Sequence, residues 1–179
     1  MKVLLGVTGC IAAYKACEVV RRLGDSGHEV QVILTESATR FVTPLSFSVL
    51  SGRPAATSLW GGDGQIDHIR LARWPDLVLL APLTANTMAR LAHGMADDLL
   101  TTVVLATEAH VPMVLAPAMN TAMWENPWVK ANLDGLMSSD RCHLVAPVAK
   151  TLACGEEGVG GLASELAIVA AVDQLVDRG

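Results

Sequence analysis

The sequence predicts an α/β protein built on a flavodoxin-like, Rossmann-type parallel sheet flanked by helices. Short apolar runs alternate with stretches whose apolar residues recur at helical spacing. Strands that alternate with helices favour βαβ units and therefore a parallel sheet. The runs lack polar alternation, which is typical of strands buried on both faces. Because the 179 residues contain no linker or repeat, a single domain over residues 1–179 is expected.

Five apolar runs are expected to form that sheet, and turn residues bound each of them. They cover residues 2–7, 29–34, 76–80, 112–116 and 143–146. Five parallel strands favour the strand order 2-1-3-4-5 of flavodoxin-like sheets. Ligands of such sheets bind beyond the carboxyl ends of the strands, so the polar residues that follow the runs are candidates for a site.

The segments between the runs carry helical spacing. The first, residues 11–23, is expected to end at Gly24 or Gly27, because glycine tolerates a positive φ angle. Residues 39–50 are expected to hold two short helices that meet near Pro44. Further helices are expected over residues 86–92, 98–106, 128–137 and 165–176.

Composition limits the class of protein. Apolar residues make up 51% of the chain and charged residues 17%, which favours a sheet covered on both faces and an oligomer interface. The net charge is −5 without a basic run, so nucleic acid is not an expected partner. No apolar run reaches the roughly 18–20 residues of a membrane span, and the short apolar start does not predict a signal peptide. Four cysteines without CxxC spacing predict a reduced, cytoplasmic protein.

The turn after the first strand is a candidate phosphate site. Residues 6–13 read GVTGCIAA; glycine permits close approach to the backbone, and the following helix presents free N–H groups. Neither a full GxGxxG nor a Walker A motif is present, and the same turn could be only a tight connection. Thr35 and Ser37 follow the second strand and add hydroxyls at the same edge. One phosphate of a mononucleotide fits this set best.

Two further strand ends carry polar residues that open a helix. Thr84 and Asn86 follow the third strand, and Asn120 follows the fourth. Thr84 and Asn120 could each be a simple helix N-cap, worth about 1 kcal/mol. Because both segments lie at neighbouring strand ends, a ligand site between them is the alternative interpretation.

His68 and Cys154 are candidates for proton transfer. The unperturbed pKa of histidine, about 6.5, suits acid–base chemistry near neutrality, although a lone histidine is more often structural. Cys154 lies in a glycine-rich segment, residues 152–161, for which no regular structure is expected. This segment is either a lid with a reactive thiol or a flexible loop with an incidental cysteine. The other histidines lack ligand spacing, so no metal site is expected.

Together these segments resemble the flavin-containing, homo-oligomeric cysteine decarboxylases over nearly the whole chain. Residues 6–15 are similar to the family's flavin-binding start, with Cys10 where a second glycine is common. Residues 43–45, 67–69, 81–86 and 94–100 also match. The most specific match is PAMNTAMW at residues 117–124, which fits the family's PxMNxxMW signature.

The resemblance implies bound FMN and a role for several residues. Three residues of this chain match the family's active-site residues, namely His68, Asn120 and Cys154. In the family, the asparagine that matches Asn120 binds the substrate carboxylate, and the cysteine that matches Cys154 acts in the last step. The resemblance places the cofactor near Gly9, Cys10, Ile11, Thr35, Ser37, Pro82, Thr84, Asn86 and Met119. It places the substrate near Asn120, Met123, Ala153 and Gly155.

In such enzymes the flavin oxidises a cysteine thiol to a thioaldehyde, carbon dioxide leaves, and an enethiol remains. Reduced flavin and the active-site cysteine then yield a saturated thiol. After the ACG element, which is residues 153–155 here, the members that act in coenzyme A biosynthesis usually have the motif GxGRM. This chain has Gly161 and Leu162 at the arginine and methionine positions of that motif. Two substrates remain open. Cys154 favours phosphopantothenoylcysteine, which would give 4′-phosphopantetheine; the missing arginine favours the C-terminal cysteine of a peptide, which would give an aminoenethiol.

Two other functions on this fold are less consistent with the sequence. Intact His68, Asn120 and Cys154 argue against a non-catalytic regulatory subunit, and the PxMNxxMW signature argues against a flavin prenyltransferase. The family also implies a homotrimer, or a homododecamer built as a tetramer of trimers, with flavin at a subunit interface. The four tryptophans are Trp60, Trp74, Trp124 and Trp128, and some of them are then expected to pack between chains.

Overall fold

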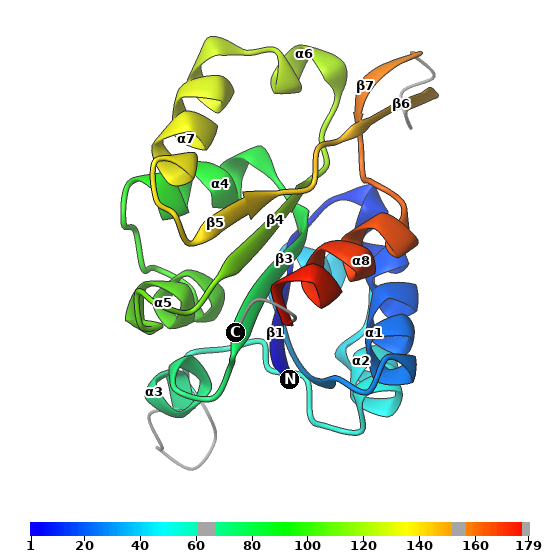
Figure 1. The fold of residues 1–179 in the computed structure, drawn as a ribbon, viewed down its shortest axis with the longest axis vertical. Coiled ribbons are helices and arrows are strands. Elements are labelled where there is room, and N and C mark those ends of the chain that lie inside the picture. The colour runs from blue at the N-terminus through cyan, green and yellow to red at the C-terminus, as the bar shows by residue number, and fades with distance from the viewer. Residues whose placement is uncertain (61–66, 152–156, 177–179) are drawn as a thin grey trace.

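A parallel sheet of five strands forms the centre of the protein in a computed structural model that describes residues 1–60, 67–151 and 157–176. The strands are β1 (Lys2–Val7), β2 (Glu29–Leu34), β3 (Leu77–Leu83), β4 (Met113–Pro117) and β5 (Cys142–Leu144). They lie in the order β2-β1-β3-β4-β5 (Figure 1). The predicted α/β class, parallel sheet and strand order are confirmed.

The strand bounds agree best with the sequence pattern at β1 and β2. β1 and β2 have the predicted ends and pair in register from Lys2–Glu29 to Val7–Leu34. β3 continues to Leu83 rather than ending at Leu80. Its register with β4 shifts between Leu80 and Leu83, where Pro82 has no N–H to donate to a neighbouring strand.

Helices cover both faces of the sheet. One face carries the 3-10 helix η1 (Ile11–Tyr14), α1 (Lys15–Asp25), α2 (Pro44–Ser51) and α8 (Glu165–Val176). The other carries α3 (Asp67–Ala72), α4 (Ala85–Ala92), α5 (Leu99–Ala106) and α7 (Pro127–Met137). Short helices η2 (Ala38–Arg40) and α6 (Thr121–Trp124) complete the strand-to-helix turns. No helix within the described ranges is long and apolar enough to cross a membrane.

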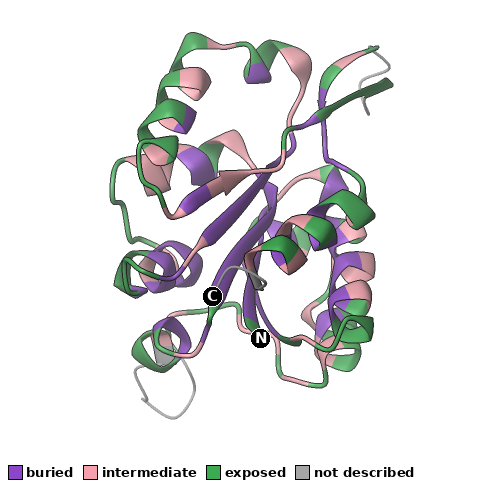
Figure 2. Cartoon of the chain, in the orientation of Figure 1, coloured by how far each residue is buried: buried purple, intermediate pink, exposed green. Residues whose placement is uncertain are grey.

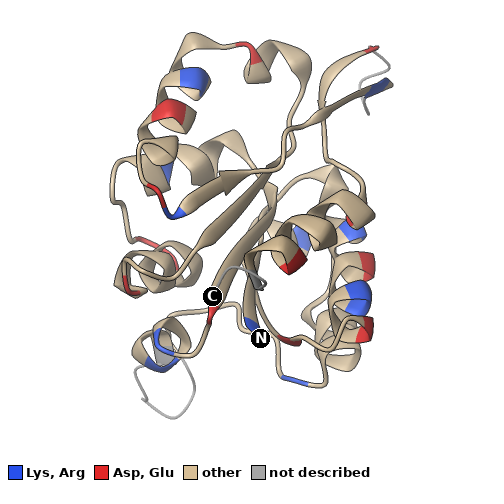
Figure 3. Cartoon of the chain, in the orientation of Figure 1, with Lys and Arg blue, Asp and Glu red and all other residues tan. Residues whose placement is uncertain are grey.

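The two helical layers explain the uninterrupted apolar strands. Val3 and Leu5 pack in the core on one face, whereas Leu4 packs in the core on the other. Successive side chains of a strand point to opposite faces, so a strand between two layers must be apolar throughout. The central strands are accordingly buried along their length (Figure 2). Charged residues lie mainly on the helices and connections around them (Figure 3).

Gly24 and Gly27 were both expected as possible ends of α1, and the structure decides between them. The helix continues through Gly24 to Asp25, and Ser26 donates its N–H to the Arg22 carbonyl. Gly27 then takes a φ angle of 81°, which glycine adopts without the steric penalty of a side chain. The helix therefore ends at Asp25, and Gly27, the second candidate, is the glycine with the positive φ angle that follows it.

A second, two-stranded sheet corrects the expectation for the glycine-rich segment. β6 (Val148–Thr151) and β7 (Glu157–Gly161) form an antiparallel hairpin. The prediction of no regular structure over residues 152–161 is therefore wrong for residues 157–161. Ladder pairing with residues 148–151 outweighs the low strand propensity of glycine. Cys154, Ala153 and Gly155 lie outside the described residues, so their predicted roles stay predictions.

Candidate functional site

A cavity of about 840 Å³ opens at the carboxyl edge of the five-stranded sheet. Its wall comes from the turns after β1, β2, β3 and β4 and from the β6–β7 hairpin. The cavity is where the parallel topology predicts a ligand, because all carboxyl strand ends meet at one edge. Ten residues predicted from the sequence line it, namely Gly9, Cys10, Ile11, Thr35, Ser37, Thr84, Asn86, Met119, Asn120 and Met123.

Thr8 ties together the turns after β1 and β3. Its buried hydroxyl donates to the Pro82 carbonyl at 2.7 Å and accepts the Thr84 N–H at 2.9 Å. Pro82 was expected at the cofactor, but it lies in buried β3 outside the cavity lining. The Pro82 carbonyl accepts the hydrogen bond from the Thr8 hydroxyl, so Pro82 holds the turn in place without lining the cavity.

The first turn approaches the second turn more closely than the sequence pattern predicts. A Cβ atom on Gly9 would collide with the side chain and backbone of Ser37. Glycine at this position therefore lets the two turns converge on the cavity, in addition to lining it. This contact supports the expectation that hydroxyls after β2 belong to the same site.

The Cys10 thiol forms part of the cavity wall. Burial raises its pKa, and this effect outweighs the opposing N–H groups of Ala12 and Ala13 and the charge of Lys150. Because the thiolate is the nucleophilic form, Cys10 stays a neutral group near pH 7. We assign it a packing role beside a ligand.

Thr84 and Asn86 open α4 at the end of β3. Thr84 is the N-cap and its hydroxyl oxygen accepts the Thr87 N–H at 3.4 Å. Asn86 lies in the first turn of the helix, exposed toward the cavity that it lines. Thr84 thus caps the helix and lines the cavity, whereas Asn86 lines the cavity without capping the helix.

Asn120 caps a helix and also lines the cavity. Its Oδ1 atom accepts the Met123 N–H at 2.9 Å and caps α6. Its Nδ2 amide has no hydrogen-bond partner among the described residues, and the side chain lines the cavity. Helix capping therefore leaves two N–H donors for a ligand carboxylate.

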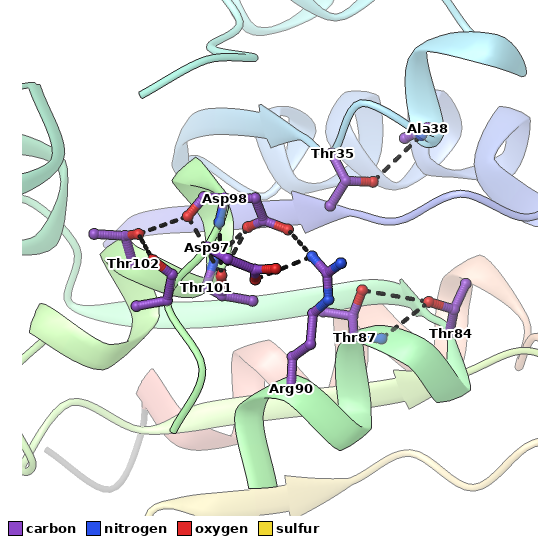
Figure 4. A network of polar contacts seen from close by, with 10 residues as sticks. Thr35, Ala38, Thr84, Thr87, Arg90, Asp97, Asp98, Thr101 and Thr102 are labelled. Carbon is purple, nitrogen blue, oxygen red and sulfur yellow. Dashed lines mark hydrogen bonds and ion pairs between the residues drawn. The ribbon is translucent and has the colours of Figure 1, made fainter. Parts of the chain in front are cut away.

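A charged network at the cavity wall was not predicted as part of the site. Arg90 of α4 lies 3.2 Å from Asp97 and 3.0 Å from Asp98 (Figure 4). Asp98 also accepts the Thr101 N–H in a capping box that begins α5. In the sequence, an aspartate directly before an apolar helix indicates a helix cap at Asp98. The ion pair between Asp98 and Arg90 is visible only in the tertiary structure.

Lys15 is a second cation at the wall with an acidic partner. Its Nζ atom lies 2.9 Å from Glu165 Oε1, at the start of α8. Burial opposes ionisation of Glu165, but its own backbone N–H and Lys15 outweigh that effect and lower its pKa. The pair joins the first and last helices beside the cavity.

The structure does not bring His68 to this cavity within one chain. His68 lies in α3, which packs against α5, and it is not among the described residues of the wall. Its predicted catalytic role stays a prediction. Of the tryptophans, Trp124 is buried in the core beneath Lys130, whereas Trp60 and Trp128 are more than 80% exposed.

The lining has the chemistry of a site for a flavin mononucleotide. Ile11, Met119, Met123 and Leu162 supply apolar surface for a ring system. Thr35, Ser37, Thr84 and Asn86 supply hydroxyl and amide groups for a polar chain and a phosphate. An apolar wall with a few placed polar groups is the usual form of a cofactor pocket.

Comparison with known proteins identifies the family. The Flavoprotein family profile matches residues 1–177. The chain belongs to the Flavoprotein family. This membership confirms the predicted single flavoprotein fold and the predicted class of cofactor.

Curated relatives of the chain include a probable decarboxylase and a bifunctional protein of coenzyme A biosynthesis. A probable phosphopantothenoylcysteine decarboxylase of Streptococcus mutans is 42% identical over 175 residues, 97% of each chain. The coenzyme A biosynthesis bifunctional protein CoaBC of Vibrio vulnificus is 44% identical over 175 residues. This chain spans only 43% of the length of that bifunctional relative.

Solved structures of the family show the same fold. A PPC decarboxylase mutant complexed with pantothenoylaminoethenethiol has a TM-score of 0.85 and 33% identity, covering 98% of both chains. The FMN-dependent cysteine decarboxylase SpaF has a TM-score of 0.82 and 33% identity, covering 98% of this chain and 97% of its own. The resemblance to flavin-containing cysteine decarboxylases is therefore confirmed.

Proposed function

We propose that the protein binds FMN and decarboxylates phosphopantothenoylcysteine to 4′-phosphopantetheine in coenzyme A biosynthesis. The observation that carries this proposal is the free amide of Asn120, held by a helix cap at the cavity wall. The names of the relatives, among them one of similar length, indicate the substrate. The three described cysteines are free thiols, which fits the reducing cytoplasm in which we place the protein.

FMN, when bound, supplies the two-electron oxidation and reduction of the substrate's cysteine carbon and sulfur atoms. The turns after β1 and β2, which converge where Gly9 meets Ser37, would hold it. Thr84 and Asn86 would bind its polar edge. The chain itself contributes binding, orientation and proton transfer.

Asn120 would orient the substrate carboxylate. A neutral amide donates to a carboxylate without adding a positive charge. That distinction matters because the carboxylate must leave as neutral carbon dioxide, and a cation would stabilise the starting state. Met119 and Leu162 would exclude water beside it. Proton transfer by Cys154 and His68 belongs to the same proposal.

We further propose that the active assembly is a homo-oligomer, with a trimer as its unit. His68 lies away from the cavity of its own chain, so a neighbouring copy would have to supply it. Apolar side chains that would be covered include Leu45 and Val49 on α2, which are 71% and 73% exposed. Stable monomers seldom leave contiguous apolar surface of this kind in water.

A peptide with a C-terminal cysteine is the second candidate substrate. The observation that favours it is Gly161 with Leu162, where the resemblance predicts an arginine and a methionine. SpaF, described as an FMN-dependent cysteine decarboxylase, is similar to this chain at the same level as the PPC decarboxylase mutant. The two substrates differ in what they carry beyond the cysteine.

Mass spectrometry of reaction products tests both candidates. The purified protein is incubated with phosphopantothenoylcysteine or with a peptide ending in cysteine, each with and without added FMN. Loss of carbon dioxide and formation of a saturated thiol from the first substrate is expected. Turnover of the peptide alone would replace the first proposal with the second. Protein that purifies without flavin absorbance and cannot be reconstituted with FMN would contradict both.

A further inference from the structure

Lys150 lies on the β6–β7 hairpin and lines the same cavity. Figure 3 shows a basic residue near the tip of β6. The lysine stem lies across Gly161, so that a Cβ atom there would come within 2.7 Å of Cδ and 2.8 Å of Cγ. Gly161 has no left-handed φ angle. The missing side chain at this position therefore makes room for Lys150, and the backbone does not require glycine.

Lys150 differs from the other cations of the wall in having no acidic partner among the described residues. Lys15 pairs with Glu165 at 2.9 Å. Arg90 pairs with Asp97 at 3.2 Å and Asp98 at 3.0 Å. Lys150 makes no ion pair with any residue in the described ranges. It is thus the cation whose charge is available to a ligand.

The charge balance of the cavity depends on Lys150. The described lining holds three cations and three anions, namely Lys15, Arg90, Lys150, Glu36, Asp97 and Asp98. Without Lys150 the anions outnumber the cations, and the cavity would repel a doubly charged ligand. The charge of Lys150 reaches the first turn, since it opposes the burial effect on the Cys10 pKa.

Three anions could meet Lys150: the cofactor phosphate, the substrate carboxylate and the substrate phosphate. The carboxylate already has the neutral donor Asn120 and must lose its charge in the reaction. A phosphate keeps about −1.5 to −2 charges throughout. We propose that Lys150 binds the substrate's phosphate and so determines the preference for a phosphorylated over an unphosphorylated substrate. This inference rests on the proposed decarboxylase function.

Steady-state kinetics of Lys150→Met test the proposal in the FMN-loaded protein. The two substrates are phosphopantothenoylcysteine and pantothenoylcysteine, which differ only in the phosphate. We expect KM for the phosphorylated substrate to rise roughly tenfold with kcat unchanged, because a charge-assisted bond made equally in ground and transition state is lost. KM for pantothenoylcysteine is expected to stay the same. Lys2→Met, at the opposite edge of the sheet, is the matched control.

A relocated cation provides the complementary test. In the double variant Lys150→Ala with Gly161→Arg, the lysine stem that blocks position 161 is gone. The arginine can then extend through the vacated space toward the cavity. We expect it to recover most of the preference for the phosphorylated substrate that Lys150→Met loses. No recovery, together with an unchanged preference in Lys150→Met, would overturn the proposal.

Calorimetry separates the sources of the anion and does not depend on turnover. Wild type and Lys150→Met, loaded with FMN, are titrated with 4′-phosphopantetheine and with pantetheine. Loss of affinity for the phosphorylated ligand alone supports the proposal. Equal loss for both ligands would overturn it, because the loss would then not depend on the phosphate. Release of FMN from the variant would overturn it in favour of the cofactor phosphate. A wild type that turns over neither substrate would refute the decarboxylase function, and the calorimetric difference would still decide the role of Lys150.

Discussion

In the function that we propose, the Asn120 side chain serves structure and ligand binding together. The oxygen of its amide caps α6 and its nitrogen is left toward the cavity. A cap orients the side chain, because Oδ1 is held by the Met123 N–H. The orientation places the donor for a carboxylate before any substrate arrives, which lowers the cost of binding.

Asn120→Asp is expected to separate the two roles. Aspartate caps helices as well as asparagine does, so the free energy of unfolding should change by less than about 0.5 kcal/mol. The new carboxylate repels the substrate carboxylate, and kcat/KM should fall roughly a hundredfold or more. Chemical denaturation and steady-state kinetics measure the two effects.

Asn126→Asp is the control for that exchange. Asn126 caps α7 through the Trp128 N–H at 3.0 Å and does not line the cavity. The same chemical change should leave kcat/KM unaltered there. Normal turnover by Asn120→Asp would remove Asn120 from the carboxylate site.

At the scale of elements, the β6–β7 hairpin is held on the turn after β4. Met119 donates its N–H to the Gly160 carbonyl at 2.9 Å. Gly160 has a φ angle of 153°, and a Cβ atom there would collide with the Met119 carbonyl. Gly158 likewise leaves room for Thr121. The glycines of this segment therefore permit close backbone packing in a regular hairpin.

Gly160→Ala is expected to loosen the hairpin while the five-stranded sheet remains. The strained φ angle and the collision should cost about 1–3 kcal/mol. Because the hairpin contacts are fewer than those of the core, the cost should show as local opening. Hydrogen exchange of residues 148–151 and 157–161 should accelerate, with the strands of the large sheet still protected.

Gly135→Ala serves as the comparison for the same substitution. Gly135 is an exposed position in α7 where a Cβ atom would meet nothing within 4 Å. Alanine there should stabilise the protein by about 0.5–1 kcal/mol. Equal exchange rates in wild type and Gly160→Ala would show that the hairpin does not depend on this glycine.

At the scale of the whole molecule, the Lys15–Glu165 pair joins helices that are 150 residues apart in sequence. It connects α1 and α8 on one face of the sheet, next to the cavity. Hydrogen bonds and charge keep the pKa of Glu165 below its ordinary value despite burial. A carboxyl group with a lowered pKa stabilises the fold only where it is ionised.

Glu165→Gln should therefore change the pH dependence of stability. The contribution of Glu165 is complete above the unfolded pKa of about 4.3 and is lost as the pH falls through the lower folded value. Wild type should be more stable than the variant at pH 7, and the difference should shrink as the pH falls below about 4.3. Urea denaturation across this range measures it. Glu29→Gln, which breaks the exposed pair with Arg53, should have a smaller effect at pH 7; an equal effect would contradict the role of Glu165.

The assembly is also a property of the whole molecule. Analytical ultracentrifugation of the FMN-loaded protein should give the mass of three or twelve chains, because α2 exposes Leu45 and Val49. Val49→Glu should shift the protein toward smaller species if α2 lies in the interface. A wild type that is monomeric at micromolar concentration would contradict the proposed oligomer.

Local patterns in the sequence predicted the elements because they depend on near neighbours. Apolar runs located β1 and β2, and capping residues located the starts of α4 and α6. The pairing of β6 with β7 was missed because the glycines of β7 have low strand propensity and local spacing does not show which segments pair. Pro82 was placed at the cofactor because adjacency in sequence cannot show which side of a strand end faces the cavity.

By itself the sequence determined the doubly covered parallel sheet, its strand order, the edge at which the cavity opens and most of the predicted residues of its wall. These follow from periodicity and from the topology of parallel strands, which bring the strand ends to one edge. Only the tertiary structure decided which charges are neutralised. Arg90 meets Asp97 and Asp98, Lys15 meets Glu165, and Lys150 meets no acid among the described residues. Ion pairing depends on distances of a few ångströms between separate elements, and spacing along the chain does not encode those distances.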